Sequence, residues 1–244
     1  MKLLISSDWH GDHVTHGVSR FAEISRAVHE SVDRAIEEQV DVYAFLGDLC
    51  NPDSGSAVFR TTRLAIEVAT RLRASGIKFL AISGNHDVIE DGSGETTLTP
   101  LSGLVDEDGM ITVCEQPALL MLDDVFVAAF PFTASAHAYD PVAKWTEFQQ
   151  KIVQLTEHWK CEKKVVVLAH MTEIEGVEPG EETTEMSRGR GVPLPADLMI
   201  NADLVANGHF HRQQLHGHVW IPGALARLTF GEERHPPSYL LASV

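Results

Sequence analysis

The sequence predicts an α/β fold, and specifically a single-domain, four-layer α/β/β/α sandwich of two mixed sheets flanked by helices. In the first half of the chain, short apolar runs alternate with helical patterns, which is typical of parallel βαβ units. The second half holds mostly strand-like runs, which favour a second sheet. Hydrophobic residues make up 44% of the 244 residues and charged residues 22%, enough for a sizeable core. We find no internal repeat or low-complexity linker, so we expect one domain over residues 1–244.

The first half predicts three strands separated by two helices. "KLLISS" (2–7), "DVYAFL" (41–46) and "IKFLAI" (77–82) are the strands. Apolar residues at steps of three or four predict the first helix: Phe21, Ile24, Val28, Val32 and Ile36. Leu64, Ala65, Val68 and Leu72 predict the second helix, which we expect to end near Gly76.

The second half predicts further strands and one more helix. The strand-like runs are 111–115, 118–122, 125–130, 164–169, 202–207, 218–223, 225–230 and 238–244. The helix is indicated by the apolar residues Val142, Trp145, Phe148, Ile152, Leu155 and Trp159. Between about 171 and 195 the chain is irregular and carries six glutamates, followed by "RGRG". An irregular segment of this length is often functional.

The composition restricts the partners and the compartment. A net charge of −16 argues against a broad, nonspecific grip on nucleic acid, although a local basic groove stays compatible with it. The three cysteines are scattered and show neither zinc spacing nor a disulfide pattern, as expected in a reducing compartment. The first residues are too short an apolar run for a signal peptide, and no run is long enough for a membrane helix. We expect a soluble, cytoplasmic protein with no membrane partner.

Polar residues of one chemical kind follow the buried strands. They are Asp8 and His10, then Asp48 and Asn51, then Asn85, His86 and Asp87, then His170, and finally His209 and His211. In an α/β sheet, ligands collect outside the carboxyl ends of the strands, so these side chains can converge. Oxygen and imidazole donors suit transition metals better than calcium. The candidate ligands outnumber the needs of one ion, which favours two ions about 3.5–4 Å apart that share a carboxylate.

Glycines precede three of these clusters. Without a Cβ atom, Gly47, Gly84 and Gly208 let the backbone turn tightly and approach a ligand closely. In His209-Phe210-His211, strand-like alternation would send both imidazoles to one side, where they could serve two neighbouring ions.

These five motifs, taken together and in this order, resemble the calcineurin-like metallophosphoesterase family over nearly the whole chain. "VPLPADL", "ADLVANGHFHR" and "WIPGALARLTFGE" add a narrower likeness to the SbcD-type branch, the nuclease subunits of double-strand-break repair. Those relatives carry capping sequence after the phosphoesterase domain. We do not expect that region here, because the sequence stops at Val244.

The resemblance implies a role for each residue. One metal would bind Asp8, His10, Asp48 and His211, and the other would bind Asp48, Asn85, His170 and His209. Two divalent transition-metal ions are therefore expected, with Mn preferred and Fe, Zn, Co or Ni as the alternatives. His86 would contact the phosphate and protonate the leaving oxygen, and Asp87 would orient His86.

The substrate side of the site departs from the repair-nuclease pattern. Archaeal and eukaryotic nucleases of this kind carry a histidine at the position of Asn51, and an amide can bind a phosphate but cannot shuttle a proton. Asn85, Asn51, Arg188 and Arg190 are the candidate substrate-binding residues, with the two arginines as a phosphate clamp.

The function predicted from these observations is a binuclear metal-dependent phosphodiesterase. The acidic composition and Asn51 favour a small diester or cyclic nucleotide. A DNA exonuclease or endonuclease of the SbcD type is the alternative, a monoester phosphatase comes third, and a catalytically silent scaffold on the same fold comes last. The sequence leaves the oligomeric state and the presence of a partner ATPase open.

Overall fold

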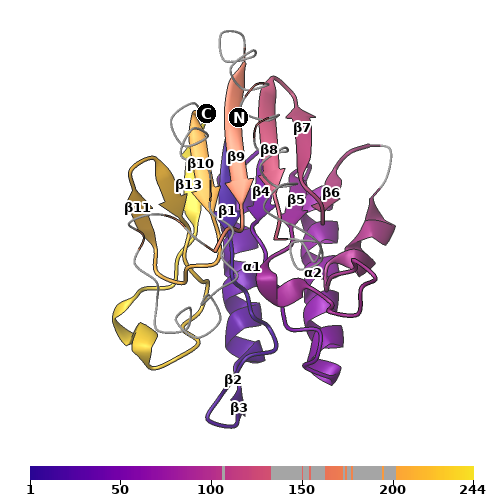
Figure 1. The fold of residues 1–244 in the computed structure, drawn as a ribbon, viewed down its shortest axis with the longest axis vertical. Coiled ribbons are helices and arrows are strands. Elements are labelled where there is room, and N and C mark those ends of the chain that lie inside the picture. Colours follow the sequence, from indigo (N-terminus) through magenta and orange to yellow (C-terminus); the bar gives the residue numbers. More distant parts are fainter. Residues whose placement is uncertain are drawn as a thin grey trace.

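Two large sheets form the framework of the protein. The computed structural model describes residues 1–105, 108–132, 163–172 and 202–244, together with residues 150, 154, 174, 177 and 194. The first sheet has the strand order β13-β1-β4-β5-β6 and the second has the order β11-β12-β10-β9-β8-β7 (Figure 1). Each sheet combines parallel and antiparallel neighbours, so both are mixed, as predicted.

The strands of the first sheet are β1 (Lys2–Ser6), β4 (Val42–Phe45), β5 (Lys78–Ile82), β6 (Ile111–Cys114) and β13 (Leu240–Ser243). Those of the second sheet are β7 (Ala118–Leu122), β8 (Val125–Phe130), β9 (Lys164–Ala169), β10 (Leu204–Asn207), β11 (Gln214–His216) and β12 (Val219–Ile221). The helices are α1 (Phe21–Glu37) and α2 (Ser56–Ala74), with the short 3-10 helices η1 (Asn85–Asp87), η2 (Thr99–Leu104) and η5 (Gly231–Arg234). A small hairpin joins β2 (Val14–Thr15) to β3 (Val18–Ser19).

Side-chain alternation along the first sheet separates its two faces. Leu4 and Phe45 point to the face covered by α1 and α2, where they join buried residues of both helices. Leu3, Ile5 and Ala44 lie on the opposite face and pack against residues of the second sheet. A strand buried on both faces must be apolar at every position, which explains the continuous apolar runs in the sequence.

The first helix shows how the pattern sets the packing. Ile24, Val28, Val32 and Ala35 recur at helical spacing and are all buried against the first sheet. The exposed face carries charged residues, some of them in ion pairs such as Arg26 with Glu30. α1 and α2 lie side by side over this sheet (Figure 1), as the alternation of strands and helices predicted.

A third group of buried residues lies on the far face of the second sheet. Phe130, Val167 and Val205 of this face pack with Met171 and Phe210, among others. The helix predicted over 142–159 and most of the irregular segment after 171 lie outside the described residues. Among the described residues, no helix is both long and apolar enough to span a bilayer.

The parallel strands determine where the polar clusters lie. β1, β4 and β5 run in parallel in the first sheet, and β9 and β10 run in parallel in the second. The segments that follow these strands therefore meet at one edge of the two-sheet sandwich.

The prediction of a strand over 225–230 is wrong. Leu225, Ala226 and Leu228 are buried in the core beneath α1 and α2 without pairing in either sheet, and the segment leads into η5. Its apolar residues reflect packing rather than a strand.

Candidate metal centre

The side chains expected to bind metal follow directly after β1, β4, β5, β9 and β10. Asp8, His10, Asp48 and His209 all have positive φ angles, between 44° and 76°, which are uncommon for residues other than glycine. Backbone hydrogen bonds of 3.0 Å from Asp8 N to Gly47 O and from His10 N to Asp48 O tie the first two loops together. Unfavourable backbone conformations of this kind persist where the surroundings hold them, and they cluster at functional sites.

Glycines leave room for this convergence, as the sequence suggested. A Cβ atom on Gly84 would lie 2.2 Å from Asp48 Oδ1, and one on Gly208 would lie 2.3 Å from Ser7 Oγ and 2.8 Å from His170 Nδ1. Since real Cβ atoms do not approach other atoms so closely, any larger residue would displace the ligand side chains.

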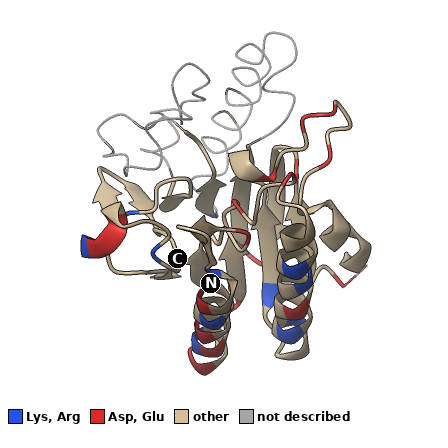
Figure 2. Cartoon of the chain, turned by 90° about the horizontal axis from the view of Figure 1, so that it is seen from below, with Lys and Arg blue, Asp and Glu red and all other residues tan. Residues whose placement is uncertain are grey.

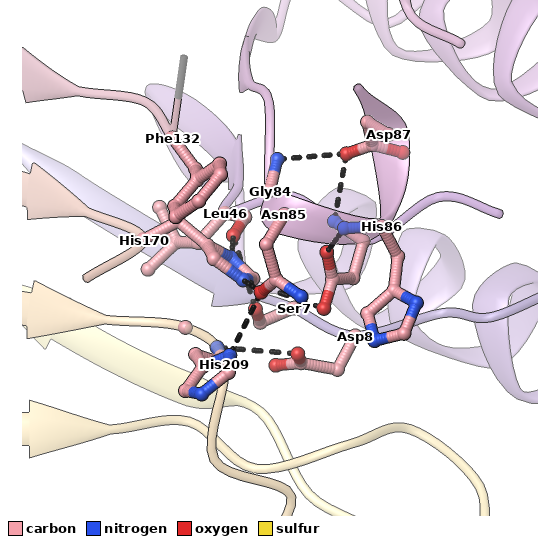
Figure 3. A network of polar contacts seen from close by, with 12 residues as sticks. Ser7, Asp8, Leu46, Gly84, Asn85, His86, Asp87, Phe132, His170 and His209 are labelled. Atoms are coloured by element: carbon pink, nitrogen blue, oxygen red, sulfur yellow. Dashed lines mark hydrogen bonds and ion pairs between the residues drawn. The ribbon is translucent and has the colours of Figure 1, made fainter. Parts of the chain in front are cut away.

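Two groups of buried side chains could each hold an ion. Asp8, His10 and His211 form the first group, and Asp48, His170 and His209 form the second. Within each group the ligand atoms lie within 4.8 Å of one another. In the first group, His10 Nε2 lies 3.1 Å from His211 Nε2. In the second group, Asn85 Oδ1 lies 3.1 Å from His170 Nε2 and 2.8 Å from His209 Nδ1 (Figure 3).

Asp48 connects the two groups. Its Oδ2 atom lies 3.3 Å from His170 Nε2 and 3.6 Å from His10 Nε2, a histidine of the other group. Its Oδ1 atom accepts a hydrogen bond of 2.8 Å from the backbone N–H of His86. The structure thus divides the residues into the same two groups as the family resemblance; that these groups bind metal stays a prediction.

Buried atoms without partners show that the site fits cations. Asp8 Oδ2 and His209 Nε2 are buried and make no hydrogen bond. Leaving such atoms unpaired costs about 1–3 kcal/mol each, and a bound cation would remove that cost. Carboxylate, amide and imidazole donors together suit a transition metal.

Hydrogen bonds behind the ligands fix which ring nitrogen faces the site. His170 Nδ1 donates to Leu46 O at 2.5 Å, and His211 Nδ1 donates to Glu232 Oε1 at 2.7 Å. A carbonyl oxygen and a carboxylate can only accept, so each Nδ1 carries a proton. Nε2 is then the ring nitrogen that faces the site, and it would bind a metal once it has lost any proton of its own.

The charges of the site favour a cation beside Asp48. Burial opposes ionisation of Asp48, but His170 and His86 outweigh it and hold the pKa of its carboxyl well below the usual value. Burial also lowers the pKa of His209 to about 3 and that of His10 well below its usual value, which keeps both imidazoles neutral and able to bind metal. At His170 burial acts in the same direction, but Asp48 outweighs it and the pKa rises to about 9.

Asp87 has different partners from those expected. Its carboxylate accepts hydrogen bonds of 2.8 Å from the backbone N–H groups of Asp48, Leu49 and Gly84, and one of 2.6 Å from the Thr97 hydroxyl. It therefore holds the loop that carries Asp48. The ring of His86 instead places Nδ1 2.7 Å from Asn51 Oδ1.

Two buried carboxylates were missed by the sequence analysis. Glu232, on η5, binds His211 and also accepts a hydrogen bond from Leu228 N. Asp12 accepts a hydrogen bond of 3.0 Å from Asn51 Nδ2. The place of Asp12 just beyond β1, close to Asp8 and His10, was a signal that could have found it. Glu232 follows the strand predicted over 225–230 and ends the stretch "WIPGALARLTFGE", where nothing pointed to a contact with His211. The candidate clamp residues Arg188 and Arg190 lie outside the described residues.

Comparisons with known proteins identify the family and similar folds. A family model described as calcineurin-like phosphoesterase matches residues 1–213. The SbcD subunit of the nuclease SbcCD from Escherichia coli (strain K12) is 24% identical over 252 residues, which cover 95% of this chain and 62% of that protein. The protein of the same name from Bacillus subtilis (strain 168) is 25% identical over 228 residues, which cover 88% of this chain and 58% of that protein. The chain thus spans less than two thirds of the length of these relatives.

Two solved structures are similar in fold. A dimetal phosphatase from Danio rerio aligns with a TM-score of 0.59 at 9% identity, covering 100% of this chain and 92% of that one. A purple acid phosphatase from yellow lupin seeds aligns with a TM-score of 0.55 at 12% identity, covering 100% of this chain and 46% of that one.

Proposed function

Because the chain belongs to the calcineurin-like phosphoesterase family, we propose that it is a binuclear metal-dependent phosphodiesterase that hydrolyses small diesters or cyclic nucleotides. The observation that carries this proposal is the pair of buried ligand groups joined by Asp48. The coarser activity, a metal-dependent hydrolase of phosphate esters, is supported by the family and by both structural neighbours.

Asp8, His10, Asp48 and His211 would hold one ion, and Asp48, Asn85, His170 and His209 would hold the other. Bound divalent ions, manganese by preference, would polarise the phosphate and make an attacking water more acidic at neutral pH. The family and the two ligand groups support a dinuclear site without identifying the metal.

The chain's own residues would handle the leaving group. His86 lies on η1, between the ligand Asn85 and Asp87, and its ring packs edge-on against His10 with the ring centroids 5.0 Å apart. A side chain in this place can reach a phosphate held at both ligand groups and donate a proton to the departing oxygen. Asn51, whose amide contacts the ring of His86, would help to hold the phosphate.

The charge of the protein supports a small substrate. Figure 2 shows Lys and Arg interspersed with Asp and Glu along α1 and α2. Several of these arginines are already paired, as Arg63 is with Glu67 and Arg71 is with Asp33. Duplex DNA binds mainly through cations that neutralise its phosphates, whereas this protein has 19 Lys and Arg against 35 Asp and Glu and a net charge of −16.

DNA cleavage is the second candidate. The bacterial relatives that the chain matches are named as nuclease subunits, which favours a nucleic-acid substrate. Arg188 and Arg190 would be the phosphate clamp in either case.

A substrate panel separates these candidates. Protein stripped of metal and reloaded with Mn²⁺ would be assayed with a chromogenic diester, a chromogenic monoester, several cyclic nucleotides and linear single- and double-stranded DNA. The proposal expects the highest kcat/KM for a small diester and loss of all activity with chelator or in the Asp48→Asn variant. Faster cleavage of DNA would put the nuclease first, and no hydrolysis of any ester with both sites loaded would indicate a scaffold.

A further inference from the structure

A chain of hydrogen bonds links the His86 ring to a carboxylate that no metal role accounts for. Asn51 Nδ2 donates to Asp12 Oδ2 at 3.0 Å, and the same amide places its Oδ1 2.7 Å from His86 Nδ1. The three residues come from the segments after β1, β4 and β5, so only the folded sheet brings them together.

The chemistry of the partners determines how the Asn51 amide is oriented. A carboxylate can only accept hydrogen bonds, so the amide must turn its NH₂ group towards Asp12. Its oxygen then faces His86. The opposite orientation would place the amide oxygen against the Asp12 carboxylate, with no proton between them.

The amide orientation in turn determines the tautomer of His86. An amide oxygen is an acceptor only, so the hydrogen bond to His86 requires the proton on Nδ1. Nε2 is then the ring nitrogen that remains for the substrate. Without Asp12, the Asn51 amide could rotate and offer its NH₂ group to Nδ1, which would stabilise the other tautomer.

Asp12 is buried, and its loop is hydrogen-bonded to the loop of Asn51. Its side chain is buried, with 9% of the residue exposed, and its Oδ1 atom is buried without a hydrogen-bond partner. The adjacent Gly11 N–H donates to Leu49 O at 3.0 Å, which joins the loop of Asp12 to the loop of Asn51. Burying a carboxylate that is only partly paired is costly, and a role in the site would offset that cost.

We propose that Asp12 is a positioning residue, which acts through Asn51 to keep the His86 ring protonated at Nδ1 and Nε2 turned towards the substrate. Nε2 then takes up the second proton of the ring and donates it to the leaving oxygen, which returns the ring to the tautomer protonated at Nδ1. The effect of Asp12 on catalysis rests on the proposed function. The chain of hydrogen bonds is independent of that proposal.

The spectroscopic arm of the test needs no turnover. Protein with nitrogen-labelled histidine and loaded with diamagnetic zinc would be examined by NMR, with His86→Gln used to identify the signals of His86. The wild type should show one His86 tautomer protonated at Nδ1. Asp12→Ala should yield a mixture of tautomers, whereas Asp12→Asn should preserve the wild-type signal, because its amide oxygen can still accept from Asn51. Asn51→Leu, at a more exposed position, tests the same link if Asp12→Ala does not fold.

The kinetic arm compares leaving groups. For a diester with an alkoxide leaving group, Asp12→Ala should lower kcat about tenfold with little change in KM. For a nitrophenyl diester, whose leaving group needs no proton, kcat should change less than twofold. Asp12→Asn should recover most of the loss, and Asp53→Ala, an exposed carboxylate on the loop of Asn51, serves as the matched control.

The two arms fail in different ways. An unchanged Nδ1–H signal in Asp12→Ala, or equal losses for both leaving groups, would overturn the role of Asp12 whatever the substrate is. If the wild type hydrolyses no diester but the tautomer still depends on Asp12, the proposed function fails and the positioning role stands.

Discussion

At the residue scale, Asp48 is the side chain that lies between the two ligand groups. Its Oδ2 atom lies within 3.6 Å of histidine nitrogens from both groups. We expect Asp48→Asn to weaken both metal sites, because a neutral amide bridges two cations poorly. The number of ions per chain, measured by elemental analysis after dialysis at fixed free metal, should fall below that of the wild type. His211→Ala is the comparison, and it should weaken mainly one site. Retention of two ions by Asp48→Asn would contradict the bridging role.

Substitution of His86 should distinguish its catalytic role from metal binding. It is expected to act on the leaving group rather than on the ions, so His86→Ala should retain metal and slow turnover by roughly 10²–10⁴-fold. The loss should be smaller for nitrophenolate, which leaves without a proton. Similar losses for good and poor leaving groups would argue against proton donation.

At the scale of the element, the 3-10 helix η5 supports the first ligand group from a segment outside the residues that match the family model. Glu232 is 4% exposed and holds His211 Nδ1 at 2.7 Å. Removing such a partner typically costs 10–100-fold in metal affinity, so Glu232→Ala should lower the affinity of the first site by about that factor. Titration with zinc and a competing chelator would measure it. Glu233→Ala, an exposed neighbour, should leave both affinities unchanged.

The turn after β10 requires glycine because of its close packing. A Cβ atom at Gly208 would lie 2.5 Å from Leu46 O, a backbone atom that cannot move aside. Gly208→Ala should therefore lower the free energy of unfolding by about 1–3 kcal/mol, as overpacking does. Urea denaturation of the metal-free protein would measure the change. Gly103→Ala is the matched control, because a Cβ atom there meets nothing within 4 Å; an equal loss in both variants would refute the packing argument.

Elements buried on both faces were the most predictable from sequence. β1, β4, β5, β8 and β9 coincide with continuous apolar runs, because a strand between two layers has no polar side. The polar residues at the strand ends could also be found in the sequence, because each of them ends a continuous apolar run. The prediction failed for 225–230 because a segment that is buried without pairing in a sheet has the same apolar sequence pattern as a buried strand.

Contacts between distant loops could not be predicted from the sequence. The partner of the His86 ring is Asn51 rather than the adjacent Asp87, because η1 turns the two neighbouring side chains in different directions. Asp12 and Asn51 are 39 positions apart, and His211 and Glu232 are 21 apart. Pairings of this kind depend on loop conformations that no local pattern encodes.

At the scale of the whole molecule, the net charge of −16 predicts how salt affects different substrates. We expect this surface to repel long DNA, and salt at physiological ionic strength would shorten the range of that repulsion to about 8 Å. We expect kcat/KM for a linear duplex to be lower than for a cyclic nucleotide and to rise with salt. The measurement is kcat/KM for both substrates at two salt concentrations. A duplex cut faster, and fastest at low salt, would show a cationic binding surface and favour the nuclease alternative.

Each ligand group takes side chains from both sheets. In the first group, Asp8 and His10 follow a strand of the first sheet, whereas His211 follows a strand of the second. In the second group, Asp48 follows a strand of the first sheet, whereas His170 and His209 follow strands of the second. Ions bound there would therefore cross-link the two sheets at one end of the sandwich, where the apolar core between the sheets ends. Binding that favours the folded state alone resists local opening. A cell short of the metal would then hold a protein that is not only inactive but also looser at that end, and more readily cut by proteases. Metal supply would in this way regulate how long the protein survives as well as whether it works.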